Sequence, residues 1–431
     1  MSLPRHSNRF SIPLLALPLS CTGDDGQEDV ADDIGTDTGS ETGDGDGDGD
    51  GGPCTAPGTV VPEIDPFVPG AEVPLPTCSD GWASDAPLQE AQWVVMIPQP
   101  DNYYYYAPPL VKALPGGAAL VIGDTSLQWY DGQGGEGPSV AHGFPSVLPN
   151  AVVVRDDGHV FIAGPSANDV AIREFADGAE LGETLVPTPG ETNRIIGLFE
   201  FSTDEWLIVG DEFDPMESMS ESFFMHVDGQ GAEVLRKARS IGYSGYYGYY
   251  YSSYLAFAAF DGDDNLLMGT NGLQFIVDPN DGTVLNPTVG LGARDVVGSR
   301  SGGGFASASQ QVNLTLDGTI SLLNGIGINQ STQAYDRAQT SDQLFDVDAR
   351  PDGGFVAAGV DGIWWSNSFG SSQPLIIAFD GGGAAEWIGR LAISGTANFV
   401  SASGDGRVVA SGVAYSGTDS SFERWQWIAS W

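Results

Sequence analysis

The chain has 431 residues, and its 58 acidic against 16 basic side chains give a formal net charge of −42. This balance argues against sequence-independent binding to nucleic acid, because no basic surface could replace the phosphate counterions. It argues equally against electrostatic attachment to anionic lipid. Hydrophobic residues make up 41% of the chain, enough for a buried core, and no apolar run reaches the ~18 residues of a transmembrane helix.

The first twenty residues have the layout of a secretory signal peptide. Arg5 and Arg9 form a short positive region, and residues 10–19 (FSIPLLALPL) are apolar but too few to span a bilayer. The run LPLSC, which ends at Cys21, resembles a bacterial lipobox. The resemblance implies an exported lipoprotein with a lipidated Cys21, held at the outer membrane or the cell surface. The alternative is an ordinary cleaved signal that leaves Cys21 as a thiol.

Two segments separate this leader from the rest of the chain. Residues 21–52 carry twelve acidic and no basic side chains with almost no apolar ones, so we expect a disordered, extended tether. Residues 53–87 form a proline-rich linker that contains Cys54 and Cys78. In an exported protein these two cysteines could close one disulfide. Two unpaired thiols, or a bond to another chain, are the alternatives.

Residues 88–431 contain a repeat with a mean period near 48 residues. Each copy has a turn followed by a short apolar strand that often ends in Gly. The seven copies are GGAALVIG from Gly116, DGHVFIAG from Asp157, DEWLIVG from Asp204, DNLLMG from Asp264, GGGFASA from Gly302, DGGFVAAG from Asp352 and DGRVVASG from Asp405.

A second signal follows most copies: an apolar strand that ends in Asp-Gly. An Asp-Gly dipeptide between two apolar runs indicates a hairpin turn. Four short strands per copy, seven times, predict an all-β fold: a seven-bladed β-propeller with four-stranded antiparallel blades. We expect residues 92–97 to complete the last blade, whose third strand ends at Trp431. The predicted Asp-Gly turns lie at Asp131, Asp177, Asp228, Asp281, Asp317 and Asp380.

Two copies resemble a known class of repeat. The runs DARPDGGFVAAG from Asp348 and FVSASGDGRVVASG from Phe399 are similar to the delta-sixty-type and related bacterial repeats that form propellers. The resemblance covers roughly residues 93–431 and implies the fold. It implies no particular activity, because such repeats occur in exported proteins of many functions.

The predicted topology sorts the connections by face. We call the face with the first and third connections of each blade the turn face, and the face with the second connections and inter-blade links the loop face. Eleven of the 14 tyrosines lie in the links that enter blades one and four. Aromatic side chains on loops suit the recognition of sugars, cations or peptides. The candidate ligand-binding residues are Tyr103, Tyr104, Tyr105, Tyr106, Tyr246, Tyr247, Tyr249, Tyr250, Tyr251, Trp364, Trp365 and Tyr415.

Catalytic patterns are sparse in this sequence. The four histidines have no metal-ligand spacing, and no nucleophile elbow or phosphate loop occurs. We therefore predict a surface-tethered propeller that binds a glycan, a peptide or an envelope protein, with no catalytic residue, metal, cofactor or nucleic acid. Two alternatives stay open. One is a glycan-active hydrolase or lyase at the channel mouth, which needs two carboxylates at a defined separation. The other is a structural scaffold of the cell envelope.

Overall fold

The computed structural model describes residues 86–431 except for 99–107, 168, 189–190, 204, 215–218, 240–241, 245–249, 253–256, 262, 264, 270–273, 288–292, 299–302, 313–315, 336–341, 363–371 and 417–422. The described residues are almost entirely β-strand. Their helical content is two 3₁₀ turns, η1 (Pro115–Gly117) and η2 (Pro149–Ala151). The predicted signal peptide and tether, and the three cysteines, lie outside the described residues.

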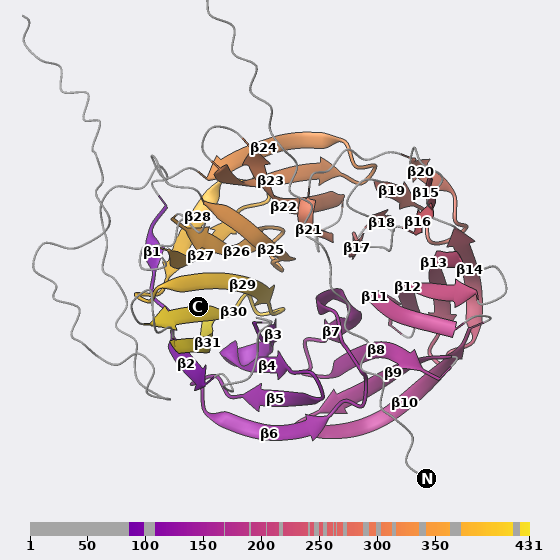
Figure 1. Ribbon diagram of the computed structural model, residues 1–431, viewed down its shortest axis with the longest axis horizontal. Coiled ribbons are helices and arrows are strands. Elements are labelled where there is room, and N and C mark those ends of the chain that lie inside the picture. Colours follow the sequence, from indigo (N-terminus) through magenta and orange to yellow (C-terminus); the bar gives the residue numbers. More distant parts are fainter. Residues whose placement is uncertain are drawn as a thin grey trace, which may run out of the picture. The chain divides into compact units, whose positions relative to one another are not determined.

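Seven four-stranded antiparallel blades form a ring, as the repeats predict (Figure 1). Blades one to three are β3 (Leu110–Ala113), β4 (Ala119–Ile122), β5 (Ser126–Tyr130) and β6 (Glu136–Ala141); β7 (Val152–Val154), β8 (Val160–Ser166), β9 (Asp169–Ala176) and β10 (Ala179–Pro187); and β11 (Glu191–Ser202), β12 (Glu205–Asp214), β13 (Met219–Asp228) and β14 (Glu233–Arg239). Blades four and five are β17 (Phe257–Phe260), β18 (Leu266–Gly269), β19 (Gln274–Val277) and β20 (Val284–Asn286); and β21 (Ala293–Gly298), β22 (Gly304–Val312), β23 (Leu316–Asn324) and β24 (Asn329–Tyr335). Blade six is β25 (Gln343–Ala349), β26 (Phe355–Asp361), β27 (Gln373–Phe379) and β28 (Ala385–Arg390).

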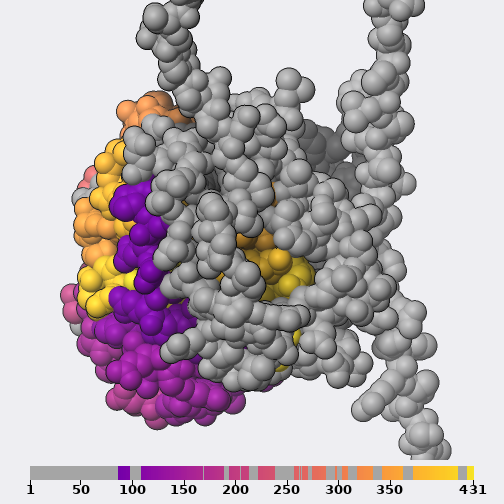
Figure 2. Space-filling model, turned by 90° about the vertical axis from the view of Figure 1, so that its left-hand side faces the viewer, coloured from indigo at the N-terminus to yellow at the C-terminus, as the bar shows by residue number. Residues whose placement is uncertain are grey.

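Blade seven joins the two ends of the domain. Its inner strands are β29 (Gly395–Ala402), β30 (Val408–Ser416) and β31 (Glu423–Ser430), and its outer strand is β2 (Trp93–Pro98). β2 pairs antiparallel with β31, from Trp93 opposite Ser430 to Pro98 opposite Trp425. Figure 2 shows the indigo residues of β1 and β2 beside the yellow C-terminal strands. The prediction that residues 92–97 complete the last blade is confirmed, and this pairing covers the free edge of β31.

A short strand that the sequence did not predict adds to blade six. β1 (Leu88–Gln89) pairs in parallel with the outer strand β28, so this sheet has five strands. The indole of Trp431 lies against this addition: its Nε1 donates to the Gln89 carbonyl at 3.2 Å. A Cβ atom on Gly389 of β28 would lie 2.6 Å from the same indole nitrogen. The C-terminal tryptophan therefore fixes β1 to the boundary between blades six and seven.

One buried apolar cluster lies at each of the seven blade-to-blade interfaces. The alternation within β26 shows how a strand serves two interfaces. Val356 and Ala358 pack toward blade seven, whereas Phe355 and Ala357 pack toward blade five. Because both faces of the middle strands are buried, their sequences are continuous apolar runs rather than alternating ones.

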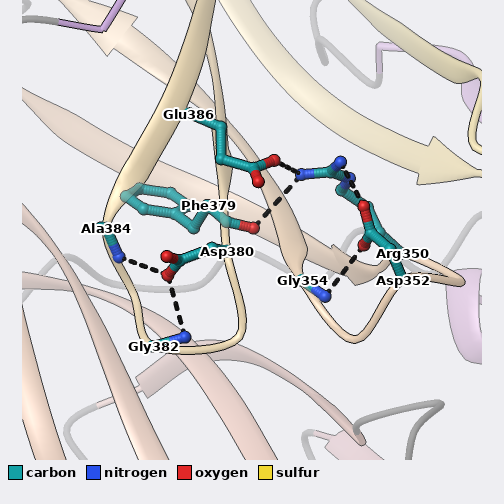
Figure 3. A network of polar contacts seen from close by, with 8 residues as sticks. All are labelled: Arg350, Asp352, Gly354, Phe379, Asp380, Gly382, Ala384 and Glu386. Atoms are coloured by element: carbon teal, nitrogen blue, oxygen red, sulfur yellow. Dashed lines mark hydrogen bonds and ion pairs between the residues drawn. The ribbon is translucent and has the colours of Figure 1, made fainter.

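The first connection of several blades is a tight turn with Asp and Gly at its third and fourth positions. In blade six, the Asp352 carboxylate accepts the Gly354 N–H at 3.0 Å, and the Arg350 N–H donates to the Gly354 carbonyl at 2.8 Å (Figure 3). Gly353 has φ +87°, a conformation that glycine adopts without steric cost. Similar bonds recur at Asp157 and Asp405.

The third connection uses its Asp differently from the prediction. In blade six, Asp380 accepts the N–H groups of Gly382 at 2.9 Å and Ala384 at 2.8 Å, and the residue with positive φ is Gly383 (Figure 3). The Asp therefore caps a longer turn instead of sitting inside a two-residue one. Asp177 and Gly178 form the two-residue type, since both have positive φ and directly join β9 to β10.

One predicted turn is wrong. Asp317 and Gly318 lie inside β23, where Asp317 pairs with Gln311 of β22. The third-connection turn of blade five starts at Asn324 instead, whose side chain accepts the Ile328 N–H at 2.9 Å. An Asn in the capping role satisfies the same backbone donors as Asp, which is why the turn has no Asp-Gly signature.

The glycine that ends the second strand of several repeats sits opposite an irregular innermost strand. A Cβ atom on Gly359 would lie 1.9 Å from the Gln343 carbonyl oxygen, and one on Gly412 would lie 1.8 Å from that of Thr396. The pairing register shifts beside each contact, between Leu344 and Asp346 and after Ala397. These β-bulges bring the backbones together, so only glycine fits.

Candidate functional site

Most of the predicted aromatic site lies outside the part of the chain that the structure describes. This holds for Tyr103 to Tyr106, Tyr246, Tyr247, Tyr249, Trp364 and Trp365. Tyr250 and Tyr251 belong to β16 (Tyr250–Ser252), which pairs with β15 (Gly242–Ser244) in the link between blades three and four. Tyr415 lies near the end of β30, where it is half-buried and its N–H donates to the Ser394 carbonyl at 2.8 Å.

The strands that frame the two tyrosine-rich links all end or begin at the loop face. The first link leaves β2 after Pro98 and reaches β3 at Leu110, and the second leaves β14 after Arg239 and reaches β17 at Phe257. β3 and β17 are the innermost strands of blades one and four, which lie three blades apart in the ring (Figure 1). Both links therefore belong to one face of one channel.

Blade three carries a charged layer near its loop-face end. The Arg194 Nε donates to Asp211 Oδ2 at 3.0 Å, and the Ser222 hydroxyl donates to Asp211 Oδ1 at 2.8 Å. Asp211 is 1% exposed. β12 continues to Asp214 and β13 begins at Met219, so Asp211 is a strand residue whose carboxylate is held by these bonds.

Blade six carries a second charged layer at the same end. Arg390 of β28 and Asp361 of β26 form an ion pair in which both side chains are at most 1% exposed. Asp342, also fully buried, accepts the Gly362 N–H at 3.0 Å. The amide of Gln343, 1% exposed, has no hydrogen-bond partner in the described part of the chain. The loops of blade six therefore leave from strand ends that contain buried polar side chains.

The channel at the ring centre contains a cavity of about 360 Å³ toward the turn face. All seven innermost strands line this cavity. Figure 1 shows these strands around the middle of the ring. Its lining residues are the last ones before the first turn of each blade, and their side chains differ from blade to blade. The 3₁₀ turn η2 also borders it, where the Asn150 side chain donates to the Ala258 carbonyl at 3.1 Å.

An arginine on the cavity wall is held from several sides. The Arg155 guanidinium lies 2.8 Å from the Glu200 carboxylate and donates to the Thr203 carbonyl at 3.2 Å. Its central carbon lies 4.4 Å from the centroid of the Phe161 ring and 5.3 Å from that of Trp206. The ion pair and the cation–π contacts fix the orientation of this side chain. The Glu200 carboxylate therefore balances the positive charge of Arg155 within the cavity wall.

Two aspartates on β25 bind the neighbouring innermost strand. Asp346 Oδ2 accepts the Val400 N–H at 2.6 Å, and Asp348 Oδ2 accepts the Ala402 N–H at 2.9 Å. These bonds join β25 of blade six to β29 of blade seven, where no sheet pairing exists. The two carboxylates are therefore structural, and Asp348 also lines the cavity.

Two carboxyl groups in the first turns of blades four and seven, at the turn-face end of the channel, have shifted pKa values. Burial raises the pKa of Asp261 above its ordinary value, although hydrogen bonds from Asn265 and Asp263 oppose the shift. Burial also acts to raise the pKa of Asp405, but hydrogen bonds from the Ser403 hydroxyl and the backbone N–H groups of Gly116 and Arg407 outweigh it and hold the pKa below its ordinary value. The Gly116 bond, 2.8 Å long, ties the first turn of blade one to that of blade seven.

The three histidines that the structure describes have structural partners away from the cavity. One nitrogen of His142 lies 2.9 Å from the Gly123 carbonyl, His159 Nδ1 lies 2.6 Å from the Glu174 carboxylate, and His226 lies 3.3 Å from Glu205. Among the described residues, no group of three or more His, Cys, Asp or Glu could hold a metal ion. In the same part of the chain, no helix has the length and apolar character to cross a membrane.

No protein-family model matches the sequence, and no curated protein matches it. Solved structures that are similar to this one include the WD40 domain of Pan2 from Neurospora crassa (12% identity, 79% of this chain and 94% of that one, TM-score 0.49). A chain of the mitotic checkpoint complex (13%, 77% and 93%, TM-score 0.45) and a protein of unknown function from Bacteroides caccae (14%, 66% and 100%, TM-score 0.40) also match.

Sequence reasoning missed the channel cavity and the buried ion pair of blade six. Lys112, Arg155 and Glu200 lie near the end of the innermost strand of blades one, two and three. They stand at different distances from the first turns of their blades, so no repeated motif marks them. No local motif marks Arg390 and Asp361, which are 29 residues apart.

Proposed function

We propose that this protein is a lipid-anchored propeller that binds a glycan, a peptide or an envelope protein through aromatic side chains of its loop face. One observation carries the proposal. The two tyrosine-rich links both start and end at the loop face, beside the innermost strands of blades one and four. Loops on a rigid scaffold are the usual place for recognition, and tyrosine supplies contact area at low entropic cost.

The scaffold beneath these links suits a binding role. The pair Arg194–Asp211, in which only the carboxylate is buried, and the fully buried pair Arg390–Asp361 lie near the loop-face ends of blades three and six. Bonded side chains of this kind limit the movement of the strand ends from which the loops leave. The acidic residues near the loops would also favour a neutral or cationic partner over an anionic one.

Binding is tested by titrating the protein with cell-envelope polysaccharides and peptides while its Tyr and Trp fluorescence is recorded. We expect a saturable change that disappears when Tyr246, Tyr247, Tyr249 and Tyr250 are all replaced by Ser. A matched variant replaces the exposed apolar residues Leu181 and Leu185 of the outer strand β10 by Ser. It should keep the full signal, because β10 is the outer strand of blade two and borders neither tyrosine-rich link.

The comparison of the two variants decides between specific binding and general adhesion. A flat response to every polysaccharide and peptide would contradict the proposal and favour the scaffold role. Equal loss of signal in both variants would show that exposed apolar surface, and not the tyrosine loops, produces the response. A response to polysaccharides but not to peptides would identify the ligand class.

The lipid anchor is tested separately by mass spectrometry of the chain expressed in a bacterial host with its own leader. We expect a mature N-terminus at Cys21 that carries the mass of several acyl chains, since stable anchoring needs more than one. A Cys21→Ser variant should lose the acyl mass and leave the membrane fraction. A wild-type chain that starts elsewhere, or that starts at Cys21 without acyl mass, would contradict the anchor.

A further inference from the structure

The wall of the channel cavity has an apolar half and a polar half. Phe199, Ala258, Phe260 and Val297, which come from blades three, four and five, form the apolar half, whose one charged side chain, Glu200 of blade three, is paired with Arg155. Lys112, Asp348, Ser401 and Ser403, which come from blades one, six and seven, form the polar half. The two halves face each other across the channel, since blades one and four lie three places apart in a ring of seven. An amphipathic compound would match such a wall.

Three of the four charged side chains on the wall are already compensated. Arg155 and Glu200 form an ion pair of 2.8 Å. The Asp348 carboxylate accepts the Ala349 N–H at 2.8 Å and the Ala402 N–H at 2.9 Å. Hydrogen bonds from backbone amides stabilise a carboxylate in its charged form. Of the four charged side chains that the structure describes on this wall, only the Lys112 ammonium has neither an ion-pair nor a hydrogen-bond partner among the described residues.

Lys112 differs from Arg155, the other cation that lines the cavity, which is paired with Glu200. Within the described ranges, no carboxylate lies within 4.0 Å of its ammonium group. The chain has 58 acidic residues and only two lysines, so an unpaired, half-buried lysine in a cavity is not explained by a shortage of acids. A partly buried cation without a partner costs free energy, and the carboxylate of a ligand would remove that cost.

We propose that the cavity binds a small organic acid, with its carboxylate paired to the Lys112 ammonium and its apolar body against Phe199 and Phe260. The cavity volume of about 360 Å³ suits a compact ligand, since small-molecule sites start at roughly 300 Å³. The site lies toward the turn face and so is separate from the loop-face site proposed above. The small number of lysines makes it possible to observe the site directly.

Reductive methylation with ¹³C-formaldehyde labels the full-length protein at Lys112 and Lys237 and keeps both charges. The Lys112→Gln variant assigns the two lysine resonances. We expect 3-phenylpropionate to shift the Lys112 resonance saturably and to leave that of Lys237, which is exposed on the outer strand β14, unchanged. Acetate lacks the apolar body and 3-phenylpropanol lacks the charge, so each should bind at least about tenfold more weakly.

Affinity measurements by calorimetry on unlabelled variants complete the test. Lys112→Gln should weaken the binding of 3-phenylpropionate by about tenfold or more, because a charge-assisted hydrogen bond is lost. Lys112→Arg keeps the charge and should retain most of the affinity, and Lys237→Gln is the matched control that should retain all of it. Circular dichroism of each variant checks its fold. Undiminished binding to a folded Lys112→Gln variant, or equal, unsaturated shifts of both lysine resonances with every probe, would overturn the proposal.

Discussion

Replacing Arg390 by Ala should lower the free energy of unfolding by about 3–5 kcal/mol, because it leaves the Asp361 carboxylate buried without its partner. Both side chains are at most 1% exposed, so the carboxylate that remains lies in a site shielded from bulk solvent. Urea denaturation followed by circular dichroism measures the loss as a lower midpoint at an unchanged slope. A changed slope would indicate that part of the chain unfolds separately.

Two further variants separate the buried charge from other effects of this substitution. Arg390→Met combined with Asp361→Leu removes both charges and should recover most of the lost stability, since apolar pairs of similar volume replace buried ion pairs well. Arg407→Ala removes an arginine that is exposed in the first turn of blade seven, and should change the stability by less than about 0.5 kcal/mol. An Arg390→Ala variant as stable as Arg407→Ala would contradict the interpretation.

Trp427→Ala should lower the free energy of unfolding by about 3–5 kcal/mol, the usual cost of removing a large buried aromatic side chain. Trp427 lies on β31, is fully buried in the cluster between blades six and seven, and donates its indole N–H to the Thr396 carbonyl at 3.2 Å. Its ring also fills the space where a Cβ atom on Gly412 would lie. The cavity left by alanine would therefore be bounded by backbone that cannot collapse into it.

The same strand supplies a matched control for this prediction. Trp425 lies two residues earlier on β31, and is only half-buried against the same cluster. Trp425→Ala should therefore cost clearly less, in proportion to the smaller apolar area that it loses. Equal losses for the two variants would show that disturbance of the β2–β31 pairing, and not cavity formation, determines the cost.

The repeats predicted the fold well because each strand of the propeller carries its own local signal. The apolar runs of the seven repeats, six of which end in Gly, became the second strands of the seven blades, and the unpartnered run at residues 92–97 became the closing strand. The predicted turn at Asp317 was wrong because the connection before β23 is short, so that the Asp-Gly pair falls within the strand. β1 has two residues and no hairpin partner, so no periodicity could reveal it.

The candidate site was less accessible to sequence reasoning for a physical reason. Aromatic links are visible as composition, whereas the cavity consists of single residues that seven separate strands bring to one axis. The compensation of charge on its wall depends on which blades are neighbours. Asp348 bonds to a strand 54 residues away, and the pair of Arg155 with Glu200 joins blades two and three. Only the closed ring shows that Lys112 has no such partner among the described residues.

The pairing of β2 with β31 also determines the order in which the domain can be built. Trp93 of β2 pairs with Ser430 of β31, so this contact joins the two ends of the domain. β2 cannot pair until β31 is present. Contacts between residues so distant in sequence slow folding. Until the contact forms, both strands expose a bare edge on which other chains can add. The edges of β2 and β31 therefore need protection from aggregation until the ring closes.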